Sequence, residues 1–127
     1  MVFVLLVVAG CAKGDVELAD VSGRVTLDGA PLARAAVVLA PIGGKGGPAY
    51  AVTDDDGRYE LAYTHDREGA VVGECTVRIK TGFQSFQDEQ EGIARPETVP
   101  AKYNVQSTLT VNVQPGGGPY DFELVTK

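Results

Sequence analysis

The feature that most constrains the fold is a period-two alternation of apolar and polar residues in short runs that end at glycine, proline or aspartate. Such alternation is typical of β-strands with one buried face, because successive side chains point to opposite sides of a strand. In the run 74–80, for example, Cys75, Val77 and Ile79 are predicted to face inward. We expect strands of this kind at 20–27, 35–39, 49–53, 58–63, 74–80, 108–113 and 120–124.

Seven short strands at regular spacing predict an all-β fold, an antiparallel two-sheet sandwich with Greek-key connections. A chain of 127 residues favours one domain. Glycine and aspartate supply the turns, as in Asp28-Gly29 after the first strand. The stretch 81–106 is predicted to be a long irregular connection with room for a short helical turn, and loops of that length are often functional.

The charge balance excludes one class of partner. The formal net charge is -6, with 17 acidic residues against 11 basic ones. A general nucleic-acid binder needs clustered lysine and arginine to neutralise phosphates. We therefore expect no nucleic acid among the partners.

The first residues predict the subcellular location. Residues 2–10 (VFVLLVVAG) are an uncharged run, which is too short to span a bilayer but suits the hydrophobic region of a secretory signal. The run ends in Val8-Ala9-Gly10-Cys11, which resembles the bacterial lipobox. The resemblance implies that Cys11 is lipidated and becomes the first mature residue. Its departure from the pattern is that no lysine or arginine precedes the apolar run.

These features divide the chain into a lipoprotein signal peptide at 1–10, a lipidated tether at 11–19 and a β-sandwich domain at 20–127. The protein would then be attached through lipid to a membrane of the bacterial cell envelope, on the periplasmic or surface side. If Cys11 is acylated, Cys75 has no intrachain partner; the alternative is a Cys11–Cys75 disulfide in an unprocessed chain. Without a CxxC pair, a structural zinc site is not expected.

Several stretches together resemble the transthyretin-like, carboxypeptidase regulatory-like domains. They are residues 21–32 (VSGRVTLDGAPL), 53–59 (TDDDGRY) and 69–74 (GAVVGE). Residues 99–104 (VPAKYN) and 120–124 (YDFEL) resemble a subset found in small bacterial envelope lipoproteins. The resemblance spans residues 20–125 and implies a prealbumin-like sandwich. Cys75 departs from it, since an aromatic residue is more usual there.

Few residues are candidates for chemistry. Asp54 and Asp56 are the weak candidates for a metal site, because calcium prefers carboxylate and carbonyl oxygens. A β-turn is the favoured interpretation, because no glutamate follows at the spacing of a calcium loop. The single histidine, His65, lies in a polar connection without a motif for a nucleophile, and Cys75 is expected to be an inert core thiol.

The resemblance also bears on catalysis. Hydroxyisourate hydrolases share the transthyretin-like fold but use several histidines and a C-terminal tyrosine-arginine-glycine-serine motif, both of which this chain lacks. We therefore predict no enzymatic activity and no cofactor.

Two functions remain open. The first is a structural or interaction module that touches another envelope protein. The alternative is a carbohydrate-binding module that uses the 81–106 loop, where Phe83, Phe86 and Tyr103 are the possible contacts. Exposed apolar residues in a loop can mark a binding site. The competing interpretation is that these aromatic residues pack onto an end of the sandwich.

Overall fold

The structure is a computed structural model that describes residues 16–43, 46–82, 90, 92 and 96–126. It is all-β, and η1 (Ala101–Tyr103), a short turn of 3-10 helix, lies in the second half of the predicted long connection. The strands are β1 (Leu18–Ala19), β2 (Val21–Leu27), β3 (Ala30–Pro31), β4 (Ala36–Pro41), β5 (Ala49–Val52), β6 (Arg58–Glu60), β7 (Ala62–Thr64), β8 (Arg67–Glu68), β9 (Ala70–Val71), β10 (Gly73–Lys80), β11 (Thr110–Val113), β12 (Gly118–Pro119) and β13 (Phe122–Leu124).

The larger sheet is antiparallel throughout, with the strand order β11-β10-β4-β5-β7-β8. Its centre is the pairing of β10 with β4, in which Val77 lies opposite Leu39. Both residues are almost completely buried, together with Val37 on β4 and Cys75 and Ile79 on β10. The predicted inward face of 74–80 is therefore confirmed.

The second sheet is built around β2. Strands β3 and β6 pair with it antiparallel, whereas β12 and β13 run parallel to it. The expectation of a purely antiparallel fold is wrong here. Parallel neighbours need a long crossover, and residues 28–117 supply it, because the chain passes through the whole larger sheet before it returns beside β2.

The predicted strand 58–63 is divided between the two sheets. Tyr59 on β6 pairs with Gly23 of β2, whereas Ala62 on β7 pairs with Tyr50 of β5. Leu61, at the crossing point, is buried and donates its N–H to the carbonyl of Val21. The predicted last strand, 120–124, is shortened to β13, with β12 just before it, and the polar connection predicted around His65 contains β8.

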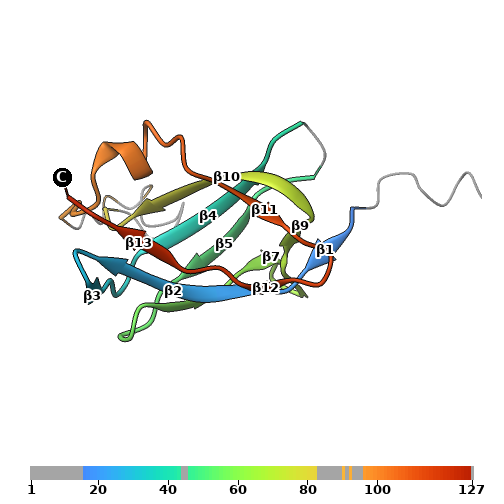
Figure 1. Cartoon of the computed structure of the whole chain (residues 1–127), viewed down its shortest axis with the longest axis horizontal. Helices are drawn as coiled ribbons and strands as arrows, with labels where there is room; N and C mark the ends of the chain where they lie inside the picture. The colour runs from blue at the N-terminus through green and yellow to red at the C-terminus, as the bar shows by residue number, and fades with distance from the viewer. Residues whose placement is uncertain (1–15, 44–45, 83–89, 91, 93–95, 127) are drawn as a thin grey trace, which may run out of the picture.

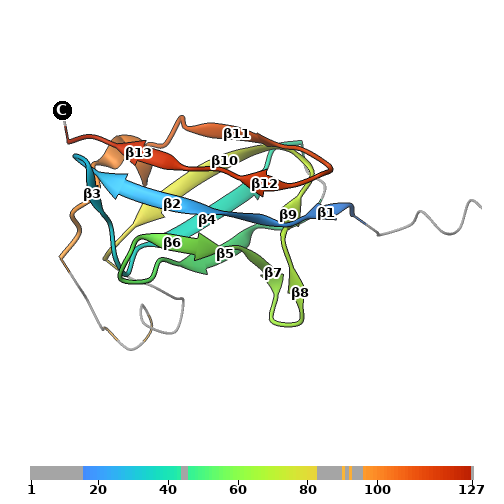
Figure 2. The ribbon, with the colours of Figure 1, turned by 60° about the horizontal axis from the view of Figure 1, so that its bottom comes forward.

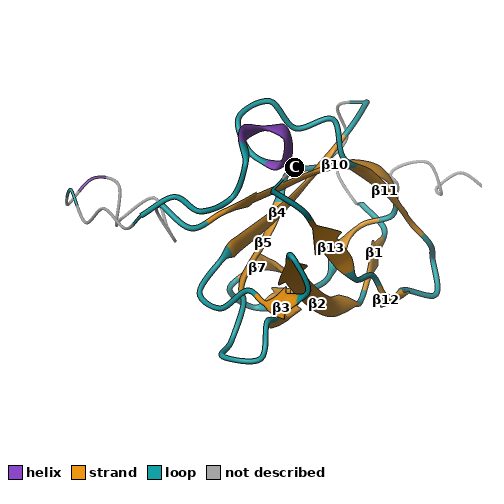
Figure 3. Ribbon diagram, turned by 60° about the vertical axis from the view of Figure 1, so that its left-hand side comes forward, coloured by secondary structure: helices purple, strands orange, loops and turns teal. Residues whose placement is uncertain are grey.

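The core lies between the two sheets, which form the two layers of a β-sandwich (Figure 3). The rings of Tyr59 and Phe122 stack at a centroid distance of 6.0 Å within it. Buried side chains from both layers make one cluster, which includes Val21, Val25, Val37, Leu39, Ala49, Tyr59, Leu61, Cys75, Val77, Ile79, Val113, Phe122 and Leu124.

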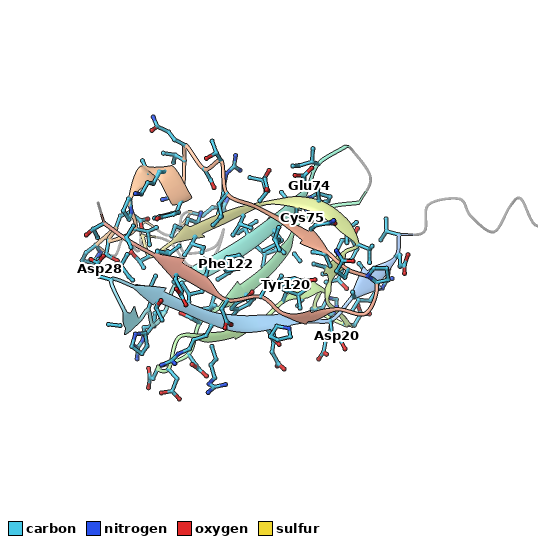
Figure 4. All side chains as sticks on the ribbon, viewed as in Figure 1. Asp20, Asp28, Glu74, Cys75, Tyr120 and Phe122 are labelled. Atoms are coloured by element: carbon cyan, nitrogen blue, oxygen red, sulfur yellow. The ribbon has the colours of Figure 1, made fainter. Side chains whose placement is uncertain are left out.

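The sandwich has two distinct ends (Figures 1 and 2). At one end β1 pairs with β9, and β12 lies close by. The opposite end carries η1, the β2–β3 hairpin and the C-terminus. Asp20 and Asp28 mark these two ends in Figure 4. Within the described residues, no helix is long and apolar enough to cross a membrane.

Candidate functional site

In the motif 21–32, Asp28 and Gly29 form the turn of the β2–β3 hairpin. Asp28 and Gly29 both have positive φ, 52° and 87°, the backbone that a tight two-residue hairpin requires. The Asp28 carboxylate accepts hydrogen bonds from the Thr126 N–H (3.0 Å) and the Thr126 hydroxyl (2.8 Å). These bonds, led by that from the Thr126 backbone, lower the pKa of Asp28. This acid therefore holds the C-terminal segment against the hairpin.

Thr53, the first residue of the motif 53–59, forms hydrogen bonds that connect this motif to the motif 21–32. Its hydroxyl donates to the Leu32 carbonyl (2.6 Å) and accepts from the Ala35 N–H (2.9 Å). The side chain is only 3% exposed. Gly57, with φ of +79°, lies so close to β2 that a Cβ would stand 2.5 Å from the Val25 carbonyl oxygen. Both residues are therefore needed to bring the two motifs together.

The metal candidates Asp54 and Asp56 lie in the turn before β6. Asp54 Oδ1 accepts from the N–H groups of Asp56 (2.9 Å) and Arg58 (3.0 Å). The bond from Arg58 is the largest cause of a lowered pKa at Asp54. Asp56 is exposed, and its carbonyl accepts from Arg24 Nε (3.0 Å). Among the described residues, no three or more His, Cys, Asp or Glu side chains are grouped so as to hold a metal.

The other two candidates for chemistry, His65 and Cys75, lie in different environments. His65 is exposed in the turn between β7 and β8. Cys75 is buried, with Sγ 3.6 Å from the Val71 carbonyl oxygen, and burial raises the pKa of its thiol. A buried thiol with a raised pKa is a poor nucleophile at neutral pH.

Tyr103 lies on η1 at the end of the sandwich that carries the C-terminus. It is half-buried and packs against the core cluster. Its hydroxyl accepts from the Val125 N–H (3.2 Å), and Lys102 Nζ lies 5.2 Å from the centroid of its ring. Phe83, Phe86 and Cys11 lie outside the described residues, so the glycan contact and the lipidation site stay predictions.

Thr81 and Glu97 form a clasp, a set of hydrogen bonds that was not predicted from the sequence. The Glu97 carboxylate accepts from the N–H groups of Thr81 (2.9 Å), Gly82 (3.0 Å) and Val99 (3.2 Å). The Thr81 hydroxyl donates to the Pro96 carbonyl (2.8 Å), and the side chain is 8% exposed. Residues 82 and 97 are thus held together just beyond the C-terminal end of β10. No local sequence signal marks Glu97, because its partners are mostly about fifteen residues away.

Because the clasp uses the Glu97 carboxylate, we expect the free energy of unfolding to depend on pH. Partial burial acts to raise the pKa of Glu97, but the three backbone bonds and the Thr81 hydroxyl outweigh it, so the pKa is lowered from 4.5. A lowered pKa stabilises the fold above pH 4.5, and this contribution is lost as pH falls through the folded-state pKa. Glu97→Gln should cost about 1 kcal/mol at pH 7, after allowing for solvent screening.

Urea denaturation at pH 7 and pH 3 measures this effect. The stability difference between wild type and Glu97→Gln should be largest at pH 7 and smaller at pH 3. Glu123→Gln, an exposed glutamate on β13, serves as the control and should differ little from wild type at either pH. A Glu97→Gln variant as stable as wild type at pH 7 would contradict the clasp.

A shallow polar groove of about 850 Å³ crosses the outer side of β2 and β6. Arg24 and Arg58 lie directly opposite each other in the pairing of these strands. Asp54, Glu60 and Asp121 also line the groove, and Asp121 accepts from the Arg24 N–H (2.9 Å). Positive and negative side chains therefore alternate here, an arrangement typical of a solvated sheet face.

The chain has a distant similarity to a solved structure. No protein family matches the sequence. No curated protein matches it either. Among solved structures, the crystal structure of a DUF3823 family protein from Parabacteroides merdae is similar over 86% of this chain, with a TM-score of 0.48 and 19% identity. The chain spans about half the length of that protein, 46%.

Proposed function

We propose that this protein is a lipid-anchored module of the bacterial cell envelope that has a structural or interaction role and no catalytic activity. The observation that carries the proposal is the run Val8-Ala9-Gly10-Cys11 at the end of a short apolar segment. A diacylated cysteine attaches a protein stably to a membrane, whereas one acyl chain does so only marginally. The β-sandwich that follows would then act at the membrane surface.

The geometry of the fold supports an anchor at this position. Cys11 precedes Leu18, the first residue of β1, by seven residues, a reach of at most about 25 Å. The chain is already held to the sandwich at Glu17, whose carbonyl accepts from the Val72 N–H (2.9 Å). The tether proposed here is therefore short, and the end formed by β1 and β9 would lie nearest the membrane.

We also propose kinship with the transthyretin-like, carboxypeptidase regulatory-like domains. The residues that carry the resemblance have structural tasks in this fold, at the hairpin of Asp28 and at the turn of Asp54. Thr53 and Gly57 connect these two places. Motif residues that are used for backbone geometry support a role as scaffold and not as catalytic machinery.

A Cys11→Ser substitution tests the anchor. The variant is expected to leave the membrane fraction or to accumulate as a larger, uncleaved precursor, because serine cannot accept the thioether-linked lipid. Cell fractionation and intact mass spectrometry check both outcomes. Cys75→Ala, which changes the buried cysteine, should keep the wild-type location. A Cys11→Ser protein with wild-type mass and location would overturn the anchor.

A further inference from the structure

The face of the larger sheet that points away from the core carries exposed apolar side chains beside basic ones. On β4, Val37 and Leu39 point into the core, so Ala36 and Val38 point outward. The strand register places Val38 between Tyr50 on β5 and Arg78 on β10. A second row, one pleat along, places Ala36 between Val52 and Lys80. We call this set the β4–β5 face: Ala36, Val38, Tyr50, Val52, Arg78 and Lys80.

The apolar part of the β4–β5 face is exposed at Tyr50 and Val52, whereas Val38 is half-buried and Ala36 is buried. Tyr50 is 57% exposed and Val52 is 46% exposed, although both lie on an inner strand of the sheet. Large apolar side chains gathered on a sheet surface are typical of contact sites. Strand β2 and its neighbours cover the opposite face of this sheet (Figure 3). Tyr50 and Val52 are therefore not needed to pack the core.

The two basic residues give the face its charge. Arg78 and Lys80 project from the same side of β10, about 7 Å apart along the strand. Arg34 and Asp55 form an ion pair at 3.5 Å beside the Ala36–Val52 row, since Arg34 comes two residues before β4 and Asp55 three residues after β5. Acidic residues lie at the margins, with Glu74 further along β10 and Glu68 beyond Ala62 at the sheet edge. A local pair of cations in a chain of net charge -6 favours an anionic ligand.

From this arrangement we infer that the β4–β5 face binds an acidic polysaccharide. The Tyr50 ring would stack on the apolar face of a sugar ring. Arg78 and Lys80, two strands or about 10 Å away, would bind carboxylate groups of neighbouring sugars. The inference deepens the proposed interaction role by naming the class of partner, and it moves the glycan contact from the 81–106 loop to the sheet.

The shape of the face favours a saccharide over other occupants. A peptide that binds a sheet commonly adds as a strand at an open edge, whereas β5, β4 and β10, which carry this face, are inner strands. A second copy of the chain in a two-fold contact centred on this face would gather four cations, Arg78 and Lys80 of each copy, in one interface. Two cations are also few for a membrane surface, where each contributes about 1 kcal/mol.

Binding to polygalacturonate, a polymer of a uronic acid, tests the inference. Isothermal titration calorimetry on the full chain in detergent micelles should show binding that weakens as salt rises from about 0.05 M to 0.5 M. The methyl-esterified polymer has the same sugar rings without the charge, and its affinity should be at least about tenfold lower, which corresponds to about 1.4 kcal/mol.

Variants locate the site. Tyr50→Ala and Arg78→Gln should each lower the affinity roughly five- to thirtyfold, as truncation of a central contact does, and Tyr50→Phe should retain it. Arg58→Gln removes the same charge from the other sheet and should bind as wild type. All four proteins should fractionate with the membrane as wild type does, so a failure of binding is distinguishable from a failure of the proposed anchor.

Three results would overturn the inference. The first is no binding to polygalacturonate, alginate, hyaluronate or chondroitin sulfate at low salt. The second is equal loss in Arg58→Gln and Arg78→Gln. The third is binding to vesicles of anionic lipid, or a concentration-dependent dimer, that Tyr50→Ala abolishes while the polysaccharide affinity is unchanged; this would assign the face to a membrane or to a second copy.

Discussion

Replacing Gly23 with alanine is expected to remove about 3–5 kcal/mol of folding stability, a large share of the 5–15 kcal/mol typical of a domain. Gly23 lies in the middle of β2, where it pairs with Tyr59 of β6. An alanine Cβ at this position would stand 2.1 Å from the carbonyl oxygen of Tyr120 and 2.7 Å from its carbon. No unstrained contact between carbon and oxygen is that short.

The clash cannot be relieved by a side-chain rotation, because the obstructing atoms belong to the backbone. That backbone is held on both sides of Gly23. The Tyr120 N–H donates to the Ser22 carbonyl (2.8 Å), and the Arg24 N–H donates to Asp121 Oδ1 (2.9 Å). Separating the strands would therefore break the parallel pairing of β2 with the C-terminal strands as well.

Urea denaturation measures the effect as a shift of the midpoint at constant slope. Gly116→Ala is the matched control, because a Cβ at Gly116 meets nothing within 4 Å. We expect this control to lie within about 0.5 kcal/mol of wild type. If Gly23→Ala were as stable as Gly116→Ala, the close approach of β2 to residue 120 would be wrong.

Tyr59→Ala is expected to have the second largest effect, a loss of about 3–5 kcal/mol. Tyr59 is 3% exposed and stacks on Phe122, so alanine leaves a cavity between the sheets. Its hydroxyl donates to the Tyr120 carbonyl (2.5 Å). Burial raises the pKa of Tyr59, with smaller contributions from Asp121 and Tyr120, so the phenol stays a neutral donor.

Thermal unfolding separates the ring from the hydroxyl. About 1 kcal/mol shifts the Tm of a domain near this size by roughly 4 °C or more, so Tyr59→Ala should lower it by well over 10 °C. Tyr59→Phe keeps the ring and should lose only about 1–2 kcal/mol. Tyr50→Ala, at an exposed tyrosine, should leave the Tm nearly unchanged. Equal Tm values for Tyr59→Ala and Tyr50→Ala would contradict the packing of the core.

The candidate site was much less predictable from sequence than the fold. The aspartates of the turn before β6 could be assigned to a turn because their partners are two to four residues away. The β4–β5 face could not be found in this way. Tyr50 and Arg78 are far apart in the chain, and only the register of β5, β4 and β10 places them in one row.

The sequence by itself determined the all-β class, the inward face of β10 and the turn at Asp28-Gly29. These properties depend on neighbours along the chain: the two-residue period of a strand and the backbone freedom of glycine. It also predicts the lipid anchor, which stays a prediction.

Only the tertiary structure decided which strands are partners. The parallel pairing of β13 with β2, the passage of the chain from one sheet to the other at Leu61, and the clasp of Thr81 with Glu97 join residues that are distant in sequence. An alternating pattern says which side of a strand is buried, but any apolar face can pack on any other. The choice among them depends on close approaches such as that of Gly23 to Tyr120, which exist only once both sheets are assembled.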